Sequence, residues 1–544
     1  MQDTGAPSGA EVDIDRFESR RSVVHARNGI VATSQPLAAE AGVSVLRGGG
    51  NAFDAAVATA AALNVVEPPS TGIGGDAFAL YRTADGDVGA MAASGVAPAA
   101  ASIEAMREET GRETMPQSGA HAVTVPGALR GFEALLDEFG RGSLGEALRP
   151  AIDYATNGYP VSEVISNLWA YGHDRLANEG AREEYSIDGR APRPGEVVTL
   201  PALGETLERI ADRGADAFYE GDIADAIVET VRARGGLLSR ADLAAYDAEF
   251  VDPVSTTYGG VEVFELPPAN QGAIALEALN IADELGLREY AHDSVERVHY
   301  GVEAMKLAFE DGHRYIADPN HADVPQLHSK AHASQRASEI TATATRDPTP
   351  GVPDASDTVL LTVADGDGNV VSFINSLFDA FGSGIAAGDT GVMLHSRGAA
   401  FSLDPDDPNR LEPRKTPFHT LIPGLARFGP DDWAAFGVMG AAMQPQGHLQ
   451  VVSNLVDYDM SLQAAVDAPR WRYLANGEVT VESRMDAEIV SGLFRRGHDV
   501  RVLPPTVFED APVGHFGGGQ IARNDGGVLS GGTDPRKDGT VSGY

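Results

Sequence analysis

The chain has 544 residues, of which 43% are hydrophobic, so it can bury a large core. It carries 79 acidic and 41 basic residues, and the resulting net charge of -38 argues against binding to nucleic acid. Because the sequence contains no cysteine, disulfides and thiolate metal sites are excluded.

The basic residues are almost all arginines. The four lysines are Lys306, Lys330, Lys415 and Lys537. Together with the acidity, this predicts adaptation to a high-salt cell, where screening weakens the repulsion between like charges. A generic acidic protein is the alternative.

Residues 1–22 are polar and acidic and lack the apolar run of a signal peptide. The sequence also has no uninterrupted apolar stretch of about 18 residues, the length that would suggest a membrane span. We therefore expect a cytoplasmic protein.

Helical patterns are concentrated in the first two thirds of the chain. Small and apolar residues at helical spacing predict helices at 52–66 and 302–315. His313, within the second of these, and His321 and His328, after it, do not have the spacing of a metal site, so we expect neither a metal nor another cofactor.

A β-hairpin is predicted further on. Apolar strands at 358–364 and 370–376 flank the turn 365–369, whose Asp, Gly and Asn residues accept positive φ. If the pairing is symmetric about the turn, Thr358 lies opposite Ser376, with Cβ atoms about 4.5–5.5 Å apart. From the hairpin alone, these could be ordinary strand residues.

Several motifs recur in a fixed order along the chain. Because of their order and spacing, the chain resembles the gamma-glutamyltransferase (glutathione hydrolase) family of N-terminal nucleophile hydrolases over almost its whole length. The motifs are LRGGGNAFDAAV at 46–57, EP at 67–68, TGIGGD at 71–76, VPG at 125–127, PPANQG at 267–272, GTDPR at 532–536 and GY at 543–544.

The resemblance implies an α+β fold, a four-layer αββα sandwich, and a precursor that cuts itself. Thr358 would attack the carbonyl of Asp357 and leave a helix-rich large chain, 1–357, and a small chain, 358–544, interwoven in one domain. The segment 341–357, rich in Thr, Ala, Pro and Asp, is expected to be a mobile linker. The freed amine of Thr358, with a reference pKa of about 7.7–8.0, would then serve as base for its own hydroxyl.

The resemblance also implies positions for the rest of the site. Gly440 and Ala441 stand where the family places a pair of residues whose N–H groups bind the oxyanion. His419 and Thr420 stand where classical members carry two substrate-binding serines, so both are expected to line the substrate pocket.

The chain departs from the family pattern around the substrate. Ser94 stands where classical members hold the γ-glutamyl carboxylate with an arginine, and Phe378, Arg397 and Ala400 replace the groups that hold its amine. Arg397 could instead bind an acidic substrate from another direction. These changes resemble the divergent oxamate amidohydrolase-like and acylase-like branch, so a small acidic amide and another acyl amide both stay open as substrates.

The predicted function is therefore that of a self-processing threonine amidohydrolase or acyltransferase. Its partners would be a small amide substrate, water or an acceptor amine, and the two chains of one precursor. One alternative is a non-processing relative that serves as a binding or scaffold protein. Another is a serine hydrolase, although no Gly-x-Ser-x-Gly motif is present.

Overall fold

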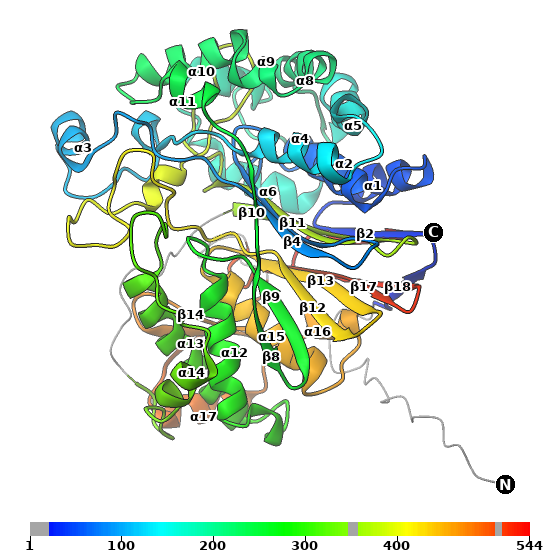
Figure 1. The fold of residues 1–544 in the computed structure, drawn as a ribbon, viewed down its shortest axis with the longest axis vertical. Helices are drawn as coiled ribbons and strands as arrows, with labels where there is room; N and C mark the ends of the chain where they lie inside the picture. The colour runs from blue at the N-terminus through cyan, green and yellow to red at the C-terminus, as the bar shows by residue number, and fades with distance from the viewer. Residues whose placement is uncertain (1–20, 346–356, 506–513) are drawn as a thin grey trace.

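The computed structural model describes residues 21–345, 357–505 and 514–544. Within those residues, two seven-stranded antiparallel sheets lie face to face, and helices cover the outer face of each (Figure 1). The chain therefore has the expected α+β architecture, a four-layer αββα sandwich.

The first sheet mixes strands from both sides of the predicted cut. Strands β10, β11 and β19 follow residue 357 or begin at it, whereas their neighbours come from the first half of the chain. Two separated chains would therefore stay joined by hydrogen bonds. In spatial order the strands are β19 (Thr540–Gly543), β2 (Gly29–Thr33), β10 (Asp357–Asp365), β11 (Val370–Phe378), β3 (Asp76–Arg82), β4 (Val88–Ala93) and β7 (Glu249–Val251).

The second sheet mixes the two parts of the chain in the same way. Its order is β1 (Val24–Ala26), β18 (Val528–Thr533), β17 (Gly518–Asp525), β13 (Asp432–Met439), β12 (Gly424–Gly429), β9 (Val261–Glu265) and β8 (Val254–Tyr258). Smaller sheets join β14 (Trp471–Tyr473), β15 (Glu478–Glu482) and β16 (Asp499–Leu503), and β5 (Tyr159–Pro160) with β6 (Val197–Val198).

Each sheet has its own helix layer. The first sheet is covered by α1 (Pro36–Arg47), α2 (Ala52–Val66), α4 (Ala128–Phe139), α5 (Leu144–Asn157), α6 (Glu163–His173), α7 (Glu179–Glu184), α8 (Pro201–Arg213), α9 (Asp216–Tyr219), α10 (Asp222–Arg232) and α11 (Arg240–Ala244). The second is covered by α12 (Gly272–Glu284), α13 (Val295–Tyr315), α14 (Lys330–Ala337), α15 (Met443–Val456), α16 (Leu462–Asp467) and α17 (Ala487–Arg496). Helix α3 (Ile103–Thr110) lies at the side (Figure 1).

Helix α2 confirms the helix predicted at 52–66. Asn51 accepts hydrogen bonds from the first turn and forms a capping box with Asp54, which fixes the start of the helix. Helix α13 begins at Val295, seven residues earlier than predicted, because Ser294 caps it by accepting from the N–H of Arg297. The first turns of α13 were missed because they contain many polar residues, so the apolar periodicity does not extend to them.

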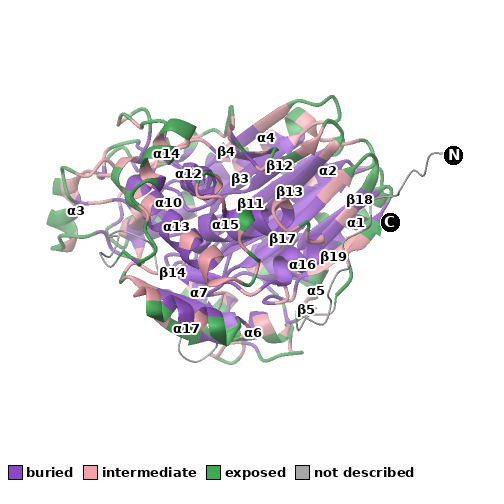
Figure 2. Cartoon of the chain, turned by 90° about the horizontal axis from the view of Figure 1, so that it is seen from below, coloured by how far each residue is buried: buried purple, intermediate pink, exposed green. Residues whose placement is uncertain are grey.

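The central strands of the two large sheets, such as β11 and β13, are almost wholly buried, whereas exposed residues gather on outer elements such as α3 (Figure 2). In β10, Val359, Leu361 and Val363 contact the helix layer, while Leu360 and Ala364 lie between the sheets. This alternation places every second side chain of the strand on the inter-sheet face. Of the helices in the described ranges, none is long and apolar enough to span a bilayer.

Residues 346–356 of the expected linker lie outside the described residues. The stretch before them contacts the helix layer of the second sheet. His299 Nε2 lies 2.8 Å from the carbonyl oxygen of Thr341, and Lys306 Nζ donates to that of Thr345 at 2.8 Å. The chain is therefore anchored on α13 just before the predicted cut.

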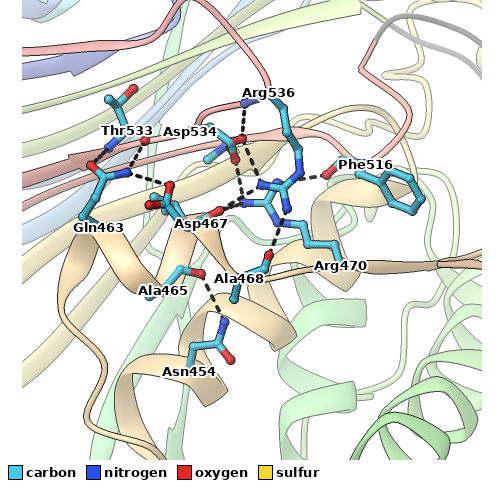
Figure 3. Close-up of polar contacts among 12 residues, drawn as sticks. Asn454, Gln463, Ala465, Asp467, Ala468, Arg470, Phe516, Thr533, Asp534 and Arg536 are labelled. Atoms are coloured by element: carbon cyan, nitrogen blue, oxygen red, sulfur yellow. Dashed lines mark hydrogen bonds and ion pairs between the residues drawn. The ribbon is translucent and has the colours of Figure 1, made fainter. Parts of the chain in front are cut away.

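A buried ion network connects the GTDPR motif to the neighbouring loops (Figure 3). Asp534 accepts from Arg470 at 2.6 Å and from Arg536 at 3.0 Å. Arg536 also donates to Glu482, which Arg484 contacts through its other oxygen; both distances are 2.5 Å. Since the motif provides one carboxylate for two guanidinium groups, it helps to hold the end of β18 against the loop after α16.

We predict that Asp534→Asn lowers the free energy of unfolding by about 3 kcal/mol, because it leaves buried guanidinium charge without a counter-charge. Thermal and urea unfolding would measure the change. Asp499→Asn, on the exposed edge of β16, serves as the control and should change stability by less than about 0.5 kcal/mol. Equal losses in the two variants would contradict the role of the network.

Candidate active site

The pairing of β10 with β11 brings two hydroxyl groups together at the end of the hairpin. Val359 pairs with Asn375, and the Thr358 hydroxyl donates to Ser376 Oγ at 3.3 Å. Thr358 is only 2% exposed. The predicted neighbourhood of Thr358 and Ser376 is therefore confirmed.

The row of polar side chains continues onto the next strand. Asp76, the first residue of β3, pairs with Ser376 and is fully buried. Its Oδ2 accepts from Arg397 Nε at 2.8 Å and lies 3.0 Å from His395 Nδ1. A carboxylate thus stands one strand beyond Ser376, in the same row as Thr358.

Asp76 and His395 were not among the candidate residues predicted from the sequence. The signal for Asp76 was present, since it ends the TGIGGD motif, where an acidic residue begins a buried strand. His395 gave no such signal, because it is brought to Asp76 by the loop after β11. Arg397 follows in the same loop, and its guanidinium lies 4.7 Å from the centre of the Phe378 ring.

The expected substrate-binding residues His419 and Thr420 join this cluster. His419 Nε2 lies 3.5 Å from Asp76 Oδ2, and Arg397 Nη1 donates to Thr420 Oγ1 at 3.3 Å. Arg397, His419 and Thr420 are therefore brought together around Asp76. Ser94 directly follows Ala93, which pairs with Ala77, and lines a neighbouring cavity.

The charges of the cluster nearly cancel. Burial raises the pKa of Asp76, but His395 and Arg397 outweigh it and hold that pKa well below its usual range. Burial and then the charge of Arg397 lower the pKa of His419 to about 3. At neutral pH the cluster accordingly holds an Asp76–Arg397 ion pair beside an uncharged His419.

A tight turn after β13 carries the expected oxyanion residues. Gly440 has φ +121° and Ala441 φ +54°, so the chain reverses between β13 and α15. Gln271 Nε2 donates to the carbonyl oxygens of Thr420, at 2.6 Å, and Ala441, at 3.0 Å. The PPANQG motif therefore ties this turn to the Asp76 cluster.

The N–H groups of the turn are available for a ligand. Neither the Gly440 nor the Ala441 N–H donates to an acceptor within the described ranges. Leu360, two residues after Thr358, meets Gly437 of β13 so closely that an added Cβ would lie 2.8 Å from Leu360 Cδ2. This contact brings the start of β10 toward the end of β13.

A cavity of about 640 Å³ lies beside the cluster, and Ser94 and Phe78 line it. Phe78 also contacts the cluster, because its ring packs edge-on against His419 with centroids 4.5 Å apart. Thr358 does not line this cavity. The acidic lining residues are Asp242, Asp247, Glu249 and Asp318, and the basic ones are Arg414 and His321.

Some buried polar atoms of this region have no hydrogen-bond partner among the described residues. They include Asp76 Oδ1, Arg397 Nη2 and Ser94 Oγ. Because an unpaired buried polar atom costs free energy, these atoms are candidates to bind polar groups of a substrate.

The fold agrees with the comparisons to known proteins. The family model described as gamma-glutamyltranspeptidase matches residues 38–544. The chain belongs to this family. It is an enzyme, an amidohydrolase of the self-processing proenzyme type.

The relatives differ in the substrates that their names state. The glutathione hydrolase-like YwrD proenzyme of Bacillus subtilis is 38% identical over 94% of this chain and 98% of its own length. The oxamate amidohydrolase proenzyme of Klebsiella pneumoniae is 36% identical over 95% of this chain and 98% of its own. The structure of cephalosporin acylase from Bacillus halodurans has a TM-score of 0.90, with 42% identity over 100% of this chain and 99% of that one.

We predict that the protein loses stability as the pH falls from about 6.5 toward 3. The pKa of His419 is lowered in the folded state, so the unfolded chain binds the proton first and acid favours unfolding. Melting temperatures measured across this range would show the loss.

His419→Gln should weaken this pH dependence by up to about 1.4 kcal/mol per pH unit, since a glutamine binds no proton. If His419→Gln and the unaltered protein show the same pH dependence, His419 does not titrate as described.

Proposed function

We propose that Thr358 is the nucleophile of this amidohydrolase and that self-cleavage after Asp357 exposes it. The observation that carries the proposal is the contact of the Thr358 and Ser376 hydroxyls beside the buried Asp76 cluster. In the cleavage, Thr358 Oγ attacks the Asp357 carbonyl carbon and the peptide C–N bond breaks as an ester forms. The break of the C–N bond frees the amine of Thr358, which takes up the hydroxyl proton. Water then hydrolyses the ester, releases the carboxylate of Asp357 and restores the Thr358 hydroxyl.

Turnover uses the same oxygen. The free amine of Thr358 takes the hydroxyl proton while Oγ attacks the carbonyl carbon of the substrate amide. The N–H groups of Gly440 and Ala441 stabilise the oxyanion. The proton passes to the leaving amine, and water or an acceptor amine then cleaves the acyl-enzyme ester. Ser376 orients the Thr358 hydroxyl.

For the substrate we propose an acyl amide without a free α-carboxylate. Ser94 offers a hydroxyl where classical members place an arginine, and the guanidinium of Arg397 is already paired with Asp76. Four carboxyl groups also line the neighbouring cavity, against Arg414 and His321. A substrate carboxylate entering by this route would meet like charges.

A small anionic amide is the second candidate. The observation that favours it is the buried Arg397 Nη2, which has no hydrogen-bond acceptor among the described residues. This donor would suit one carboxylate oxygen of a molecule as small as oxamate.

The self-cleavage proposal predicts that Thr358→Ala yields a single uncut band on a denaturing gel, whereas the unaltered protein yields a large and a small fragment. Thr358→Ser keeps a hydroxyl and should still be cut, which separates lost chemistry from failed folding. Thr362→Val, at a buried hydroxyl on the same strand, is the matched control and should be cut normally. Fragments from Thr358→Ala would overturn the proposal.

The substrate proposal predicts that an N-acyl anilide without α-amino and α-carboxylate groups is hydrolysed with a kcat/KM about 100-fold above that of γ-glutamyl anilide, because the carboxylate clamp is absent. Oxamate is assayed in the same experiment to test whether a small anionic amide is the substrate. Equal turnover of γ-glutamyl anilide would show that the replacement of the arginine by Ser94 has no effect.

We further propose that the protein works at high ionic strength. The net charge is -38, and three of the four lysines, Lys306, Lys415 and Lys537, are buried with 6%, 0% and 5% exposure. The surface is therefore almost free of lysine. Cytoplasmic location stays a prediction.

The salt proposal predicts that activity and melting temperature fall on dialysis from molar KCl into dilute buffer, because repulsion between acidic side chains is no longer screened. Full activity in dilute buffer would contradict the proposal.

A further inference from the structure

In the helix layer of the second sheet, three helices bring one imidazole and two carboxyl groups together. Glu277 lies on α12, Asp311 on α13 and His332 on α14. His332 Nε2 is 3.0 Å from Asp311 Oδ2 and 3.2 Å from Glu277 Oε1. Two ligands of a tetrahedral ion with bonds of about 2.0–2.1 Å lie about 3.3 Å apart, so these separations already match those around a bound ion.

Glu277 is the residue that most needs a partner. Its side chain is 0% exposed, and neither carboxyl oxygen has a hydrogen-bond donor within the described residues. A buried carboxylate in this state requires a proton or a cation. Burial, followed by the neighbouring Asp311, raises the pKa of Glu277 to about 11. The carboxyl group therefore stays protonated at neutral pH unless a cation binds beside it.

The net charge of the side chains around Glu277 is compatible with a divalent ion. Arg336 Nε lies 2.9 Å from Asp311 Oδ2 and offsets one of the two carboxylates. A divalent ion would offset the second carboxylate and leave the cluster with a net positive charge. Glu310 and Glu339, which are exposed and form ion pairs with Arg336, reduce that positive charge. The His332 side chain is 28% exposed, so the ion has a route from solvent.

A second cluster of the same residue types serves as a contrast. His299, Glu303 and His498 also lie within reach of one another. There, however, Lys306 Nζ lies 2.7 Å from Glu303 Oε1 and provides a cation from the chain itself. No ammonium group contacts Glu277 among the described residues, so Glu277, unlike Glu303, has no lysine from the chain as its counter-charge.

We propose that Glu277, Asp311 and His332 bind one divalent metal ion of the zinc class, with water completing the coordination. One imidazole nitrogen with two carboxylate oxygens suits Zn²⁺ or Co²⁺, whereas Ca²⁺ and Mg²⁺ prefer oxygen alone. The ion would join α12, α13 and α14, and α14 is the last helix before residues 346–356 and the predicted cut. The site would therefore stabilise the part of the fold that leads to Thr358.

The test uses the full chain without a histidine tag, stripped with EDTA and then equilibrated with Zn²⁺. Elemental analysis after gel filtration should find a single tightly held ion per chain, and Zn²⁺ should raise the melting temperature. Co²⁺ in its place should give the visible absorption of a nitrogen and oxygen site.

Glu277→Gln keeps the volume of the side chain, resembles the protonated acid and should lower the affinity for Zn²⁺ about 100-fold. Glu310→Gln is the matched control. Glu310 also contacts Arg336, at 2.7 Å, but is 56% exposed and lies outside the ligand set, so this variant should bind Zn²⁺ normally.

Two results would overturn the proposal. The unaltered chain could bind no Zn²⁺ and show no Co²⁺ absorption, in which case Glu277 holds a proton shared with Asp311. Alternatively, Glu277→Gln could bind Zn²⁺ as tightly as the unaltered chain, in which case the ion lies elsewhere.

Discussion

The antiparallel pairing of β10 with β11 is the constraint on which the candidate active site depends. It sets Thr358 against Ser376, and the pairing of β11 with β3 adds Asp76 to the same row. A shift of one residue in this pairing would turn these side chains to the helix layer. The alternation of Val359 and Leu361 toward the helices and Leu360 toward the second sheet opposes such a shift.

Asp76 and Arg397 also form an ion pair in the site, so the positive charge of Arg397 has a counter-charge from the chain before any substrate binds. Both side chains are fully buried. A buried arginine that already has its counter-ion attracts an anion less than a free arginine does. The proposed preference for substrates without a free α-carboxylate rests on this ion pair, within a fold that is that of the gamma-glutamyltranspeptidase family.

Much of the fold could be predicted from local patterns. The hairpin around residues 365–369 and helix α2 follow from turn residues, capping and apolar periodicity. The Asp76 cluster could not be predicted in this way, because its contacts join strands and loops about 300 residues apart in sequence. Glu277 and His332 were missed for the same reason, since only the packing of three helices brings them together.

In the proposed mechanism, Thr358 is both the new N-terminus and the residue that carries the acyl group. The most direct test is mass spectrometry of the processed protein after rapid quenching with a slowly hydrolysed amide. We expect a small chain that begins at Thr358 and carries the mass of the acyl group on its N-terminal residue. An acyl group on any other residue, or a small chain that begins elsewhere, would contradict it.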